Sequence, residues 1–306
     1  MKTGRRQMWW ADLLSGNQVH CALKRSLLAI AVMSLCSSVR AASTVNSANK
    51  FSYGANIGWA DWRGDPNAGA VIGEYVCSGY IYSANVGWIN LGSGTPANSI
   101  QYQNDSATDY GVNQDGLGNL RGFAYGANIG WIGFENSGAP KVDLVTGKMT
   151  GSIYSANCGW ISLSNAFATV QTDTILPGAL AANGLPIAWL LQSFGTTQVL
   201  ANADADGDSA SNMQEYLAGT NPNDAGSKFI VTLYSTSPDG SLTTLAWSSV
   251  LTRQYRIQQT VDLNSPWFDS GLGLVLPDGA NTSRTFAETN SPRRFFRVKA
   301  GQPLAP

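Results

Sequence analysis

Runs in which apolar and polar residues alternate occupy residues 43–172 and return over residues 228–300. Runs such as "GFAYG" and "GWIGFE" in the first region, and "LTTLAWSSV" and "RQYRIQQTVDL" in the second, are typical of half-buried strands. Turn signals rich in Gly, Asn and Asp separate these runs. The pattern predicts a mainly β protein, with a tandem β-repeat domain over residues 43–172 and a β-sandwich over residues 228–300.

Two short helices are predicted between these regions, in the linker formed by residues 173–227. The stretch "LPIAWLLQSFG" has Pro186 near its start and Gly195 at its end, where these residues favour the beginning and the end of a helix. The stretch "SNMQEYLAG" places Ser211 three residues before Gln214, which is the spacing of a capping box. We therefore expect a short helical linker between the two β regions.

The repeat region holds four copies of one motif. They read "FSYGANIGWADW" from Phe51, "YIYSANVGWINL" from Tyr80, "FAYGANIGWIGF" from Phe123 and "SIYSANCGWISL" from Ser152. Each copy predicts a strand, a tight "AN-x-G" turn and a second strand, because Gly tolerates positive φ and the Asn side chain can bond its local backbone. Such repetition is typical of stacked or symmetric units that share one core. Sandwich, prism-like and solenoid arrangements of the copies all stay open.

Each copy contains a tryptophan, and these are Trp59, Trp88, Trp131 and Trp160. The tryptophans lie in the most invariant part of the motif, which favours a role as core plugs. The alternative is that the repeated Trp and Tyr side chains form platforms for the apolar faces of sugar rings. The motif resembles the "GWI-x-F" repeats of some bacterial secreted proteins, and this resemblance implies secretion without implying an activity.

Residues 1–41 are predicted to be a secretory signal peptide. Lys24 and Arg25 precede the apolar run "SLLAIAVMSLC", which is too short to span a bilayer, and small residues mark a cleavage point near Ala41. No second long apolar run follows, so we expect no membrane span in the mature chain. The predicted location is outside the cell or at its surface.

Cleavage at this point changes the charge and the chemistry of the chain. It removes six of the 19 basic residues but one of the 20 acidic residues, and it also removes the single histidine, His20. An acidic mature chain has no basic field for a phosphate backbone, which argues against nucleic-acid partners. A chain without histidine cannot build a Ser-His-Asp system or a His-ligated zinc site.

Two cysteines, Cys77 and Cys158, remain after cleavage. An oxidising exterior would allow them to form a disulfide. Cys158, however, takes the motif position that Ile57, Val86 and Ile129 occupy in the other copies, which favours an apolar buried slot. Both interpretations stay open.

The segment "DADGDSASNMQE" carries the most specific chemical signal in the sequence. Its loop positions 1, 3, 5, 7, 9 and 12 are Asp204, Asp206, Asp208, the Ala210 carbonyl, Asn212 and Glu215. A calcium loop directs oxygen ligands inward from these positions, and flexible oxygen ligands favour Ca²⁺ over octahedral Mg²⁺. Position 6 is Ser209, where paired EF-hands need Gly.

The segment continuing to "GTNPNDAGS" resembles the thrombospondin type 3 or dockerin-like calcium loops of secreted bacterial multidomain proteins. The resemblance implies a structural Ca²⁺ ion that fixes a linker. Dockerins bind a cohesin through two such loops, and the single loop here argues against that role. The stretch from "LAWSSVLTRQYRIQQTVDLNSPWFD" to "RRFFRV" is similar to the fibronectin-III-like sandwich modules that follow such loops.

Together these features predict a secreted, calcium-stabilised cell-surface or matrix protein with a structural or adhesive role and no catalysis, whose partners are polysaccharides or surface proteins. The alternative is a carbohydrate-binding module with Trp and Tyr platforms. A glycosidase with two carboxylates is a third hypothesis, with Asp61, Asp65, Glu74 and Glu135 as candidates. It is disfavoured because these residues do not recur across the copies.

Overall fold

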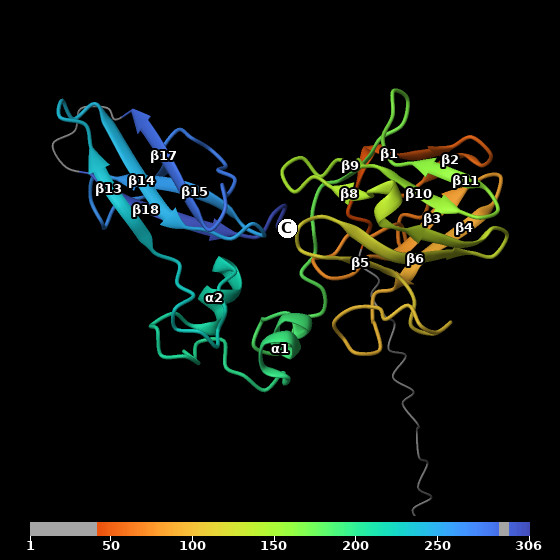
Figure 1. Ribbon diagram of the computed structural model, residues 1–306, viewed down its shortest axis with the longest axis horizontal. Helices are drawn as coiled ribbons and strands as arrows, with labels where there is room; N and C mark the ends of the chain where they lie inside the picture. The colour runs from red at the N-terminus through yellow and green to blue at the C-terminus, as the bar shows by residue number, and fades with distance from the viewer. Residues whose placement is uncertain (1–41, 288–293) are drawn as a thin grey trace, which may run out of the picture. The chain divides into compact units, whose positions relative to one another are not determined.

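A computed structural model of the 306-residue chain describes residues 42–287 and 294–306. The predicted signal peptide lies outside the described residues. Strands dominate the described part, and the prediction of a mainly β protein is confirmed (Figure 1).

Eight strands of the repeat region form one closed antiparallel barrel (Figure 1). Each copy of the motif supplies one hairpin, and the hairpins pair in sequence order until the last strand pairs with the first, through Tyr53 opposite Ser162 and Gly54 opposite Ile161. The hairpins are β1 (Val45–Gly54) with β2 (Gly58–Asp61), β3 (Ser78–Ser83) with β4 (Gly87–Ser93), β6 (Leu120–Gly126) with β7 (Gly130–Phe134), and β10 (Ser152–Ser155) with β11 (Gly159–Ser162).

The barrel is none of the three arrangements that the sequence left open. A closed sheet leaves no unpaired edge strand, and four copies of a two-stranded unit are enough to close it. Alternate residues point inward and fill the interior, among them Ile81, Ile89, Ile132 and Phe134. The outward positions of the same strands carry the motif aromatic residues.

Short strands extend the barrel sheet or lie beside it. β12 (Val170–Thr172) pairs with β1, and β5 (Val112–Gln114) pairs with β6. β8 (Lys141–Val142) and β9 (Met149–Thr150) form a separate hairpin. The sole helical turn described in this region is the 3-10 turn η1 (Asn136–Gly138).

The four hairpin turns are bonded into a ring. Each motif Asn donates from its side chain to a backbone carbonyl in the turn of the adjacent hairpin, rather than to its own turn as the sequence suggested. The bonds run from Asn56 to Cys158 (3.1 Å), Asn85 to Ile57 (3.0 Å), Asn128 to Val86 (3.1 Å) and Asn157 to Ile129 (3.1 Å). The side chains of the four acceptor residues lie in or against the barrel core. The repeated Asn therefore links neighbouring copies into a closed end.

The alternation of "YGAN" and "YSAN" follows from the same ring. A Cβ at Gly54 would lie 3.0 Å from the Ile57 side chain, and one at Gly126 would lie 2.9 Å from Ile129. In the other two copies, the hydroxyls of Ser83 and Ser155 donate to the carbonyls of the same two isoleucines. In the first and third copies, the Gly leaves space for the Ile side chain of its own turn. In the second and fourth copies, the Ser hydroxyl bonds to the carbonyl of the Ile in the preceding copy.

Removing one bond of the ring is expected to destabilise the barrel measurably. Asn128→Ala leaves the Val86 carbonyl without its partner, which costs about 1 kcal/mol of unfolding free energy and lowers the melting temperature by about 2–4 °C. Exposed Asn67, mutated to Ala, is the matched control, for which the change is expected to stay below about 0.5 kcal/mol. Equal melting temperatures for the two variants would show that the bond from Asn128 to Val86 contributes no stability.

The linker forms two short helices, as predicted. α1 (Ile187–Phe194) follows Pro186 and ends at Gly195, which has a left-handed conformation (φ 68°). α2 (Asn212–Ala218) begins with a capping box between Ser211 and Gln214. The helices pack through a small cluster in which the rings of Trp189 and Tyr216 lie 5.6 Å apart.

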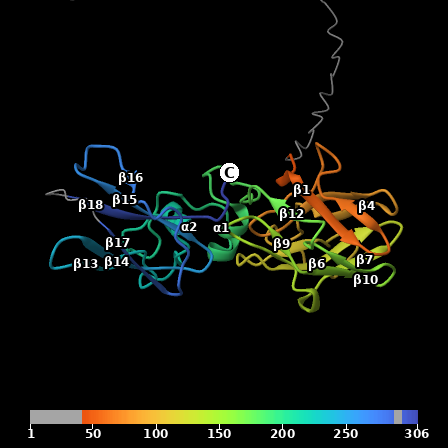
Figure 2. The same ribbon diagram turned by 90° about the horizontal axis from the view of Figure 1, so that it is seen from above.

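The C-terminal region forms the predicted β-sandwich, whose two three-stranded sheets lie in separate layers (Figure 2). Trp247 and Phe286 from one sheet and Tyr255 and Ile257 from the other are buried in one core. The first sheet contains β13 (Val231–Thr236), β14 (Leu242–Ser248) and β17 (Asn281–Ala287). The second contains β15 (Gln254–Thr260), β16 (Phe268–Asp269) and β18 (Phe295–Gly301).

Candidate functional sites

Four pairs of Tyr and Trp lie on the outside of the barrel, one pair on each hairpin. The two residues of a pair are directly opposite each other across the hairpin, and their ring centroids lie 4.8–5.4 Å apart. The pairs are Tyr53 with Trp59, Tyr82 with Trp88, Tyr125 with Trp131, and Tyr154 with Trp160. The four Trp side chains are 45–49% exposed. We call these four groups the aromatic clusters.

A third ring supports the indole in three of the clusters. Phe51, Tyr80 and Phe123 lie 5.9–6.2 Å from Trp59, Trp88 and Trp131, in edge-to-face contact. The fourth copy has Ser152 at the equivalent position. Flanking rings restrict the rotamers of the indole, so the solvent-facing surface of each Trp is held in place before any ligand arrives.

The interpretation of the motif Trp as a core plug is wrong. In a strand, adjacent side chains point to opposite faces, and the residue after each Trp points inward: Ala60, Ile89, Ile132 and Ile161 are all buried. The Trp must then face outward. The residues that plug the end of the barrel are those before the motif Gly, including Ile57 and Cys158. The motif tyrosines, which the sugar-platform alternative already included, lie beside the Trp because each pair is directly opposite across its hairpin.

The acidic loop has the geometry of a cation site. One carboxylate oxygen from each of Asp204, Asp206 and Asp208 lies within 4.8 Å of the others. Two oxygens bound to one calcium ion at about 2.4 Å lie at most about 4.8 Å apart, so these three are close enough to share an ion. Backbone amides of Gly207 and Ser209 donate to Asp204 and fold the loop around it. Hydrogen bonds from these amides lower the pKa of Asp204.

Three buried oxygens of the loop and of α2 have no hydrogen-bond partner. Asn212 and Glu215 are fully buried in α2, yet Asn212 Oδ1, Glu215 Oε2 and Asp206 Oδ2 have no hydrogen-bond partner. Burial, followed by the nearby charge of Asp206, raises the pKa of Glu215 to about 7. Leaving a buried carboxylate unpaired beside other carboxylates is costly, and a divalent cation removes that cost. The residues therefore fit a hard cation. Ala210 lies on the same loop, and its amide donates to Asp208 Oδ1 (2.7 Å).

Ser209 has a left-handed conformation (φ 82°) at the loop position where EF-hands have Gly. This conformation costs a residue with a Cβ about 1–2 kcal/mol, part of which is offset because Gly is more flexible when unfolded. We expect Ser209→Gly to raise the unfolding free energy by about 0.5–1 kcal/mol in calorimetry. Ser211→Gly, two residues further at φ −79°, is the control and is expected to change stability in the opposite direction. A lower unfolding free energy for Ser209→Gly would contradict the claim that the left-handed conformation of Ser209 is strained.

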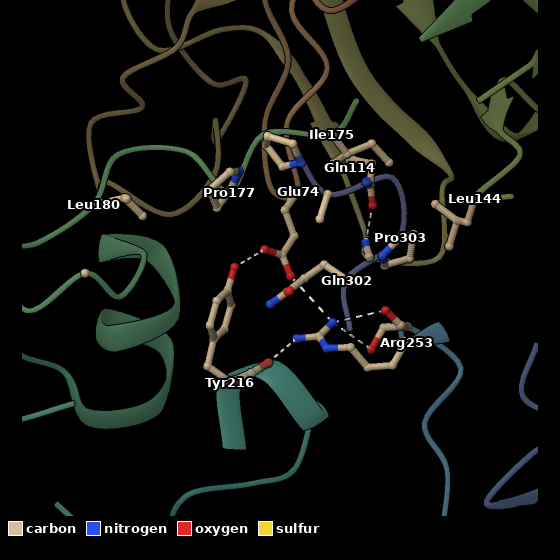
Figure 3. Close-up of a pocket in the computed structure, with 15 residues that line it drawn as sticks. Glu74, Gln114, Leu144, Ile175, Pro177, Leu180, Tyr216, Arg253, Gln302 and Pro303 are labelled. Carbon is tan, nitrogen blue, oxygen red and sulfur yellow. Dashed lines mark hydrogen bonds and ion pairs between the residues drawn. The ribbon is translucent and has the colours of Figure 1, made fainter. Parts of the chain in front are cut away.

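Glu74 lies in a small cluster with Tyr216 and Arg253 (Figure 3). The Tyr216 hydroxyl donates to Glu74 Oε2 (2.8 Å), and Arg253 Nη1 lies 3.6 Å from Glu74 Oε1. Burial raises the pKa of Glu74, while the Arg253 charge and the Tyr216 bond oppose this rise. Arg253 also donates to the carbonyls of Tyr216 and Leu217 in α2. The charges and bonds of the cluster satisfy one another, which is typical of a structural contact.

The other carboxylates considered for glycoside hydrolysis are engaged separately. Asp61 pairs with Lys50 (2.7 Å). Asp65 accepts hydrogen bonds from the amides of Asn67 and Ala68 and closes a turn. Glu135 begins the 3-10 turn η1. Each has a local role of its own, and none faces a second candidate carboxylate in these contacts.

Cys77 and Cys158 are both buried and unpaired. Cys158 lies at the closed end of the barrel with Ile57 and Ile129, as the apolar slot predicts. Burial raises the pKa of Cys77 to about 12, which keeps it a thiol. Of the two interpretations of the cysteines, the structure supports the buried slot over the disulfide.

Comparison of the chain with known protein families, with curated proteins and with solved structures gives no match. Within the described residues, neither helix has the length and the apolar character needed to cross a membrane. The fold and the sites alone define the molecule as a mainly β protein with an aromatic-decorated barrel, an acidic loop and a β-sandwich.

Proposed function

We propose that this protein is a secreted, calcium-stabilised carbohydrate-binding protein of the cell surface or matrix. The observation that carries the proposal is the set of four half-exposed Trp side chains, each held beside a Tyr on the outside of one barrel. Exposed apolar groups gathered at equivalent positions are typical of binding sites, whereas single exposed residues need no explanation.

Sugar rings match the chemistry of these clusters. One face of a pyranose ring presents C–H groups, which are attracted to the electron-rich face of an indole, while its hydroxyls remain available to water or to the Tyr hydroxyl. Four similar sites on one barrel suit a repeating polymer, because binding at one site raises the effective concentration at the next. A polysaccharide of the cell surface or matrix is therefore the proposed partner.

Calcium would serve a structural role in this protein. Asp204, Asp206, Asp208, Asn212 and Glu215 would hold the ion through side-chain oxygens, with the Ala210 carbonyl as a further ligand. Because the ion would bind the folded loop in preference to the unfolded one, its binding free energy would add to folding stability. The resemblance to thrombospondin type 3 loops and the predicted signal peptide support this role outside the cell, where Ca²⁺ is available. We propose no catalytic activity.

The proposal is tested by titrating neutral oligosaccharides, such as cello-, xylo-, manno- and chitotetraose, into the protein. Binding over the aromatic clusters is expected to shift indole emission to shorter wavelength and to shield it from acrylamide. If no neutral or acidic oligosaccharide or insoluble polysaccharide changes the emission or retains the protein, the carbohydrate proposal is wrong.

A further inference from the structure

The cluster around Trp131 differs from the other three because a long loop places a further aromatic ring beside it. The connection between β4 and β6, residues 94–119, is longer than the connections formed by residues 62–77 and 135–151. Its Tyr110 ring lies 5.0 Å from the Trp131 indole at an interplanar angle of 85°. The loop and the barrel border an open hollow of about 410 Å³, lined by Asn104, Asp105, Ser106, Ala107, Tyr110, Phe123 and Trp131.

Among the described residues, Trp131 is the one motif tryptophan with an aromatic contact from outside its own hairpin. The turn η1 lies beside Trp160, where a Cβ at Gly138 would come within 2.9 Å of the indole, but it brings no aromatic ring to it. At Trp131 the loop adds the ring of Tyr110, so a ligand there can contact a second aromatic side chain. A concave site removes more of a ligand from water than a flat one, and it therefore binds a short ligand more tightly.

Hydrogen bonds hold the loop of residues 94–119 in place beside Trp131. Asn104 accepts a hydrogen bond from the Gly111 amide (3.0 Å), and buried Asp109 accepts one from the Ala97 amide (3.0 Å). Asn90 on β4 donates to the Tyr110 hydroxyl (3.0 Å), which ties the loop to the barrel. Since these contacts already order the loop, a ligand would not have to order it on binding.

The polar groups at the hollow select for a class of ligand. The Tyr110 oxygen already accepts a bond from Asn90, which leaves its proton to donate to a ligand oxygen. Asp105 is exposed at the rim, and its carboxylate can accept bonds from sugar hydroxyls. The same negative charge repels a uronate or another acidic sugar.

We propose that the hollow beside Trp131 is the principal sugar subsite of the barrel and that it takes a neutral pyranose unit. This inference rests on the proposed carbohydrate binding and goes beyond it by ranking the four clusters and naming the ligand class. The other three clusters then act as weaker platforms along a longer chain.

Calorimetric titration of cello-, xylo-, manno- and chitotetraose into the full protein tests this ranking, because a tetrasaccharide is too short to need all four clusters. Trp131→Ala is expected to lower the affinity of the tightest site at least tenfold. Trp59→Ala, Trp88→Ala and Trp160→Ala are each expected to lower it less than threefold. Phe167→Ala, which removes an exposed aromatic residue outside the clusters, is the control and is expected to bind as the unmodified protein does.

The charge of Asp105 is tested separately with tetragalacturonate. Asp105→Asn is expected to weaken the neutral tetrasaccharide several-fold and to improve the binding of tetragalacturonate. Equal losses from all four Trp variants, or tighter binding of tetragalacturonate than of every neutral tetrasaccharide, would overturn the principal subsite while leaving carbohydrate binding in place. Absence of tetrasaccharide binding in a protein that still binds a polysaccharide would overturn the subsite alone. Absence of binding by every oligosaccharide and every polysaccharide would overturn the proposed function and the subsite with it.

Discussion

Calcium is expected to raise the melting temperature of the acidic-loop region by about 5–10 °C relative to the same protein in chelator. Free ligand at one hundred times its dissociation constant stabilises the folded state by about 2.7 kcal/mol, and each kcal/mol moves the melting temperature by about 2–4 °C for a chain of this size. Magnesium at the same concentration is expected to give a smaller shift, since the loop offers flexible oxygens rather than an octahedral cage. Differential scanning calorimetry measures both.

The variant Glu215→Gln distinguishes a calcium site from an acidic loop that binds no ion. Its melting temperature relative to the unmodified protein is expected to differ between calcium and chelator. With calcium present, the variant is expected to melt below the unmodified protein, because it lacks a charged ligand. In chelator it is expected to melt at or above the unmodified protein, because a buried carboxylate beside Asp206 and Asp208 no longer has to be accommodated. Glu135→Gln, an exposed site, is the matched control and should keep the full calcium shift. A calcium response that survives Glu215→Gln would place the ion elsewhere.

Replacing Trp59, Trp88, Trp131 and Trp160 together by Ala is expected to reduce affinity for a neutral polysaccharide at least a hundredfold. A polymer that contacts several clusters gains avidity from each, so loss of all four removes more than the sum of single changes. The barrel is expected to stay folded, because the four side chains are half exposed and the interior residues are unchanged. Loss of the cross-strand Tyr–Trp contacts costs about 0.5–1.5 kcal/mol each, so the variant should melt at a lower temperature.

Affinity electrophoresis in gels containing each polysaccharide measures this loss, and circular dichroism confirms the fold. Replacement of the same four residues by Tyr is the conservative counterpart, because Tyr keeps an aromatic face. It is expected to retain part of the affinity that the Ala variant loses. If the Ala variant migrates with the same retardation as the unmodified protein, the clusters are not the binding surface.

The strand-turn-strand units, the two helices and the sandwich were predictable because they depend on local signals. Alternation gives the strands, Pro186 and Gly195 bound α1, and the Ser211–Gln214 capping box begins α2. The metal-ligand spacing is local too, and the structure brings the three aspartates together as that spacing requires.

Closure of the barrel depends on contacts between residues far apart in the sequence. The pairing of Gly54 with Ile161 and the bond from Asn56 to Cys158 join the first copy to the last, and no local pattern records them. The apolar residue that follows each Trp indicates the face on which the Trp lies, whereas the invariance of the Trp favours burial and is misleading here. One feature of the sequence indicates the long loop beside Trp131. Trp88 and Trp131 are 43 residues apart, whereas the other neighbouring motif tryptophans are 29 residues apart.

The most direct measurement of carbohydrate binding follows the indole N–H signals of the ¹⁵N-labelled protein by NMR while a neutral tetrasaccharide is added. Signals of the exposed residues Trp59, Trp88, Trp131 and Trp160 are expected to shift, with Trp131 shifting at the lowest concentration. Signals of buried Trp62, whose indole donates to Ser52, and of buried Trp247 are expected to stay in place. Shifts confined to other tryptophans, or no shift at the four motif residues with any neutral sugar, would contradict binding at the aromatic clusters.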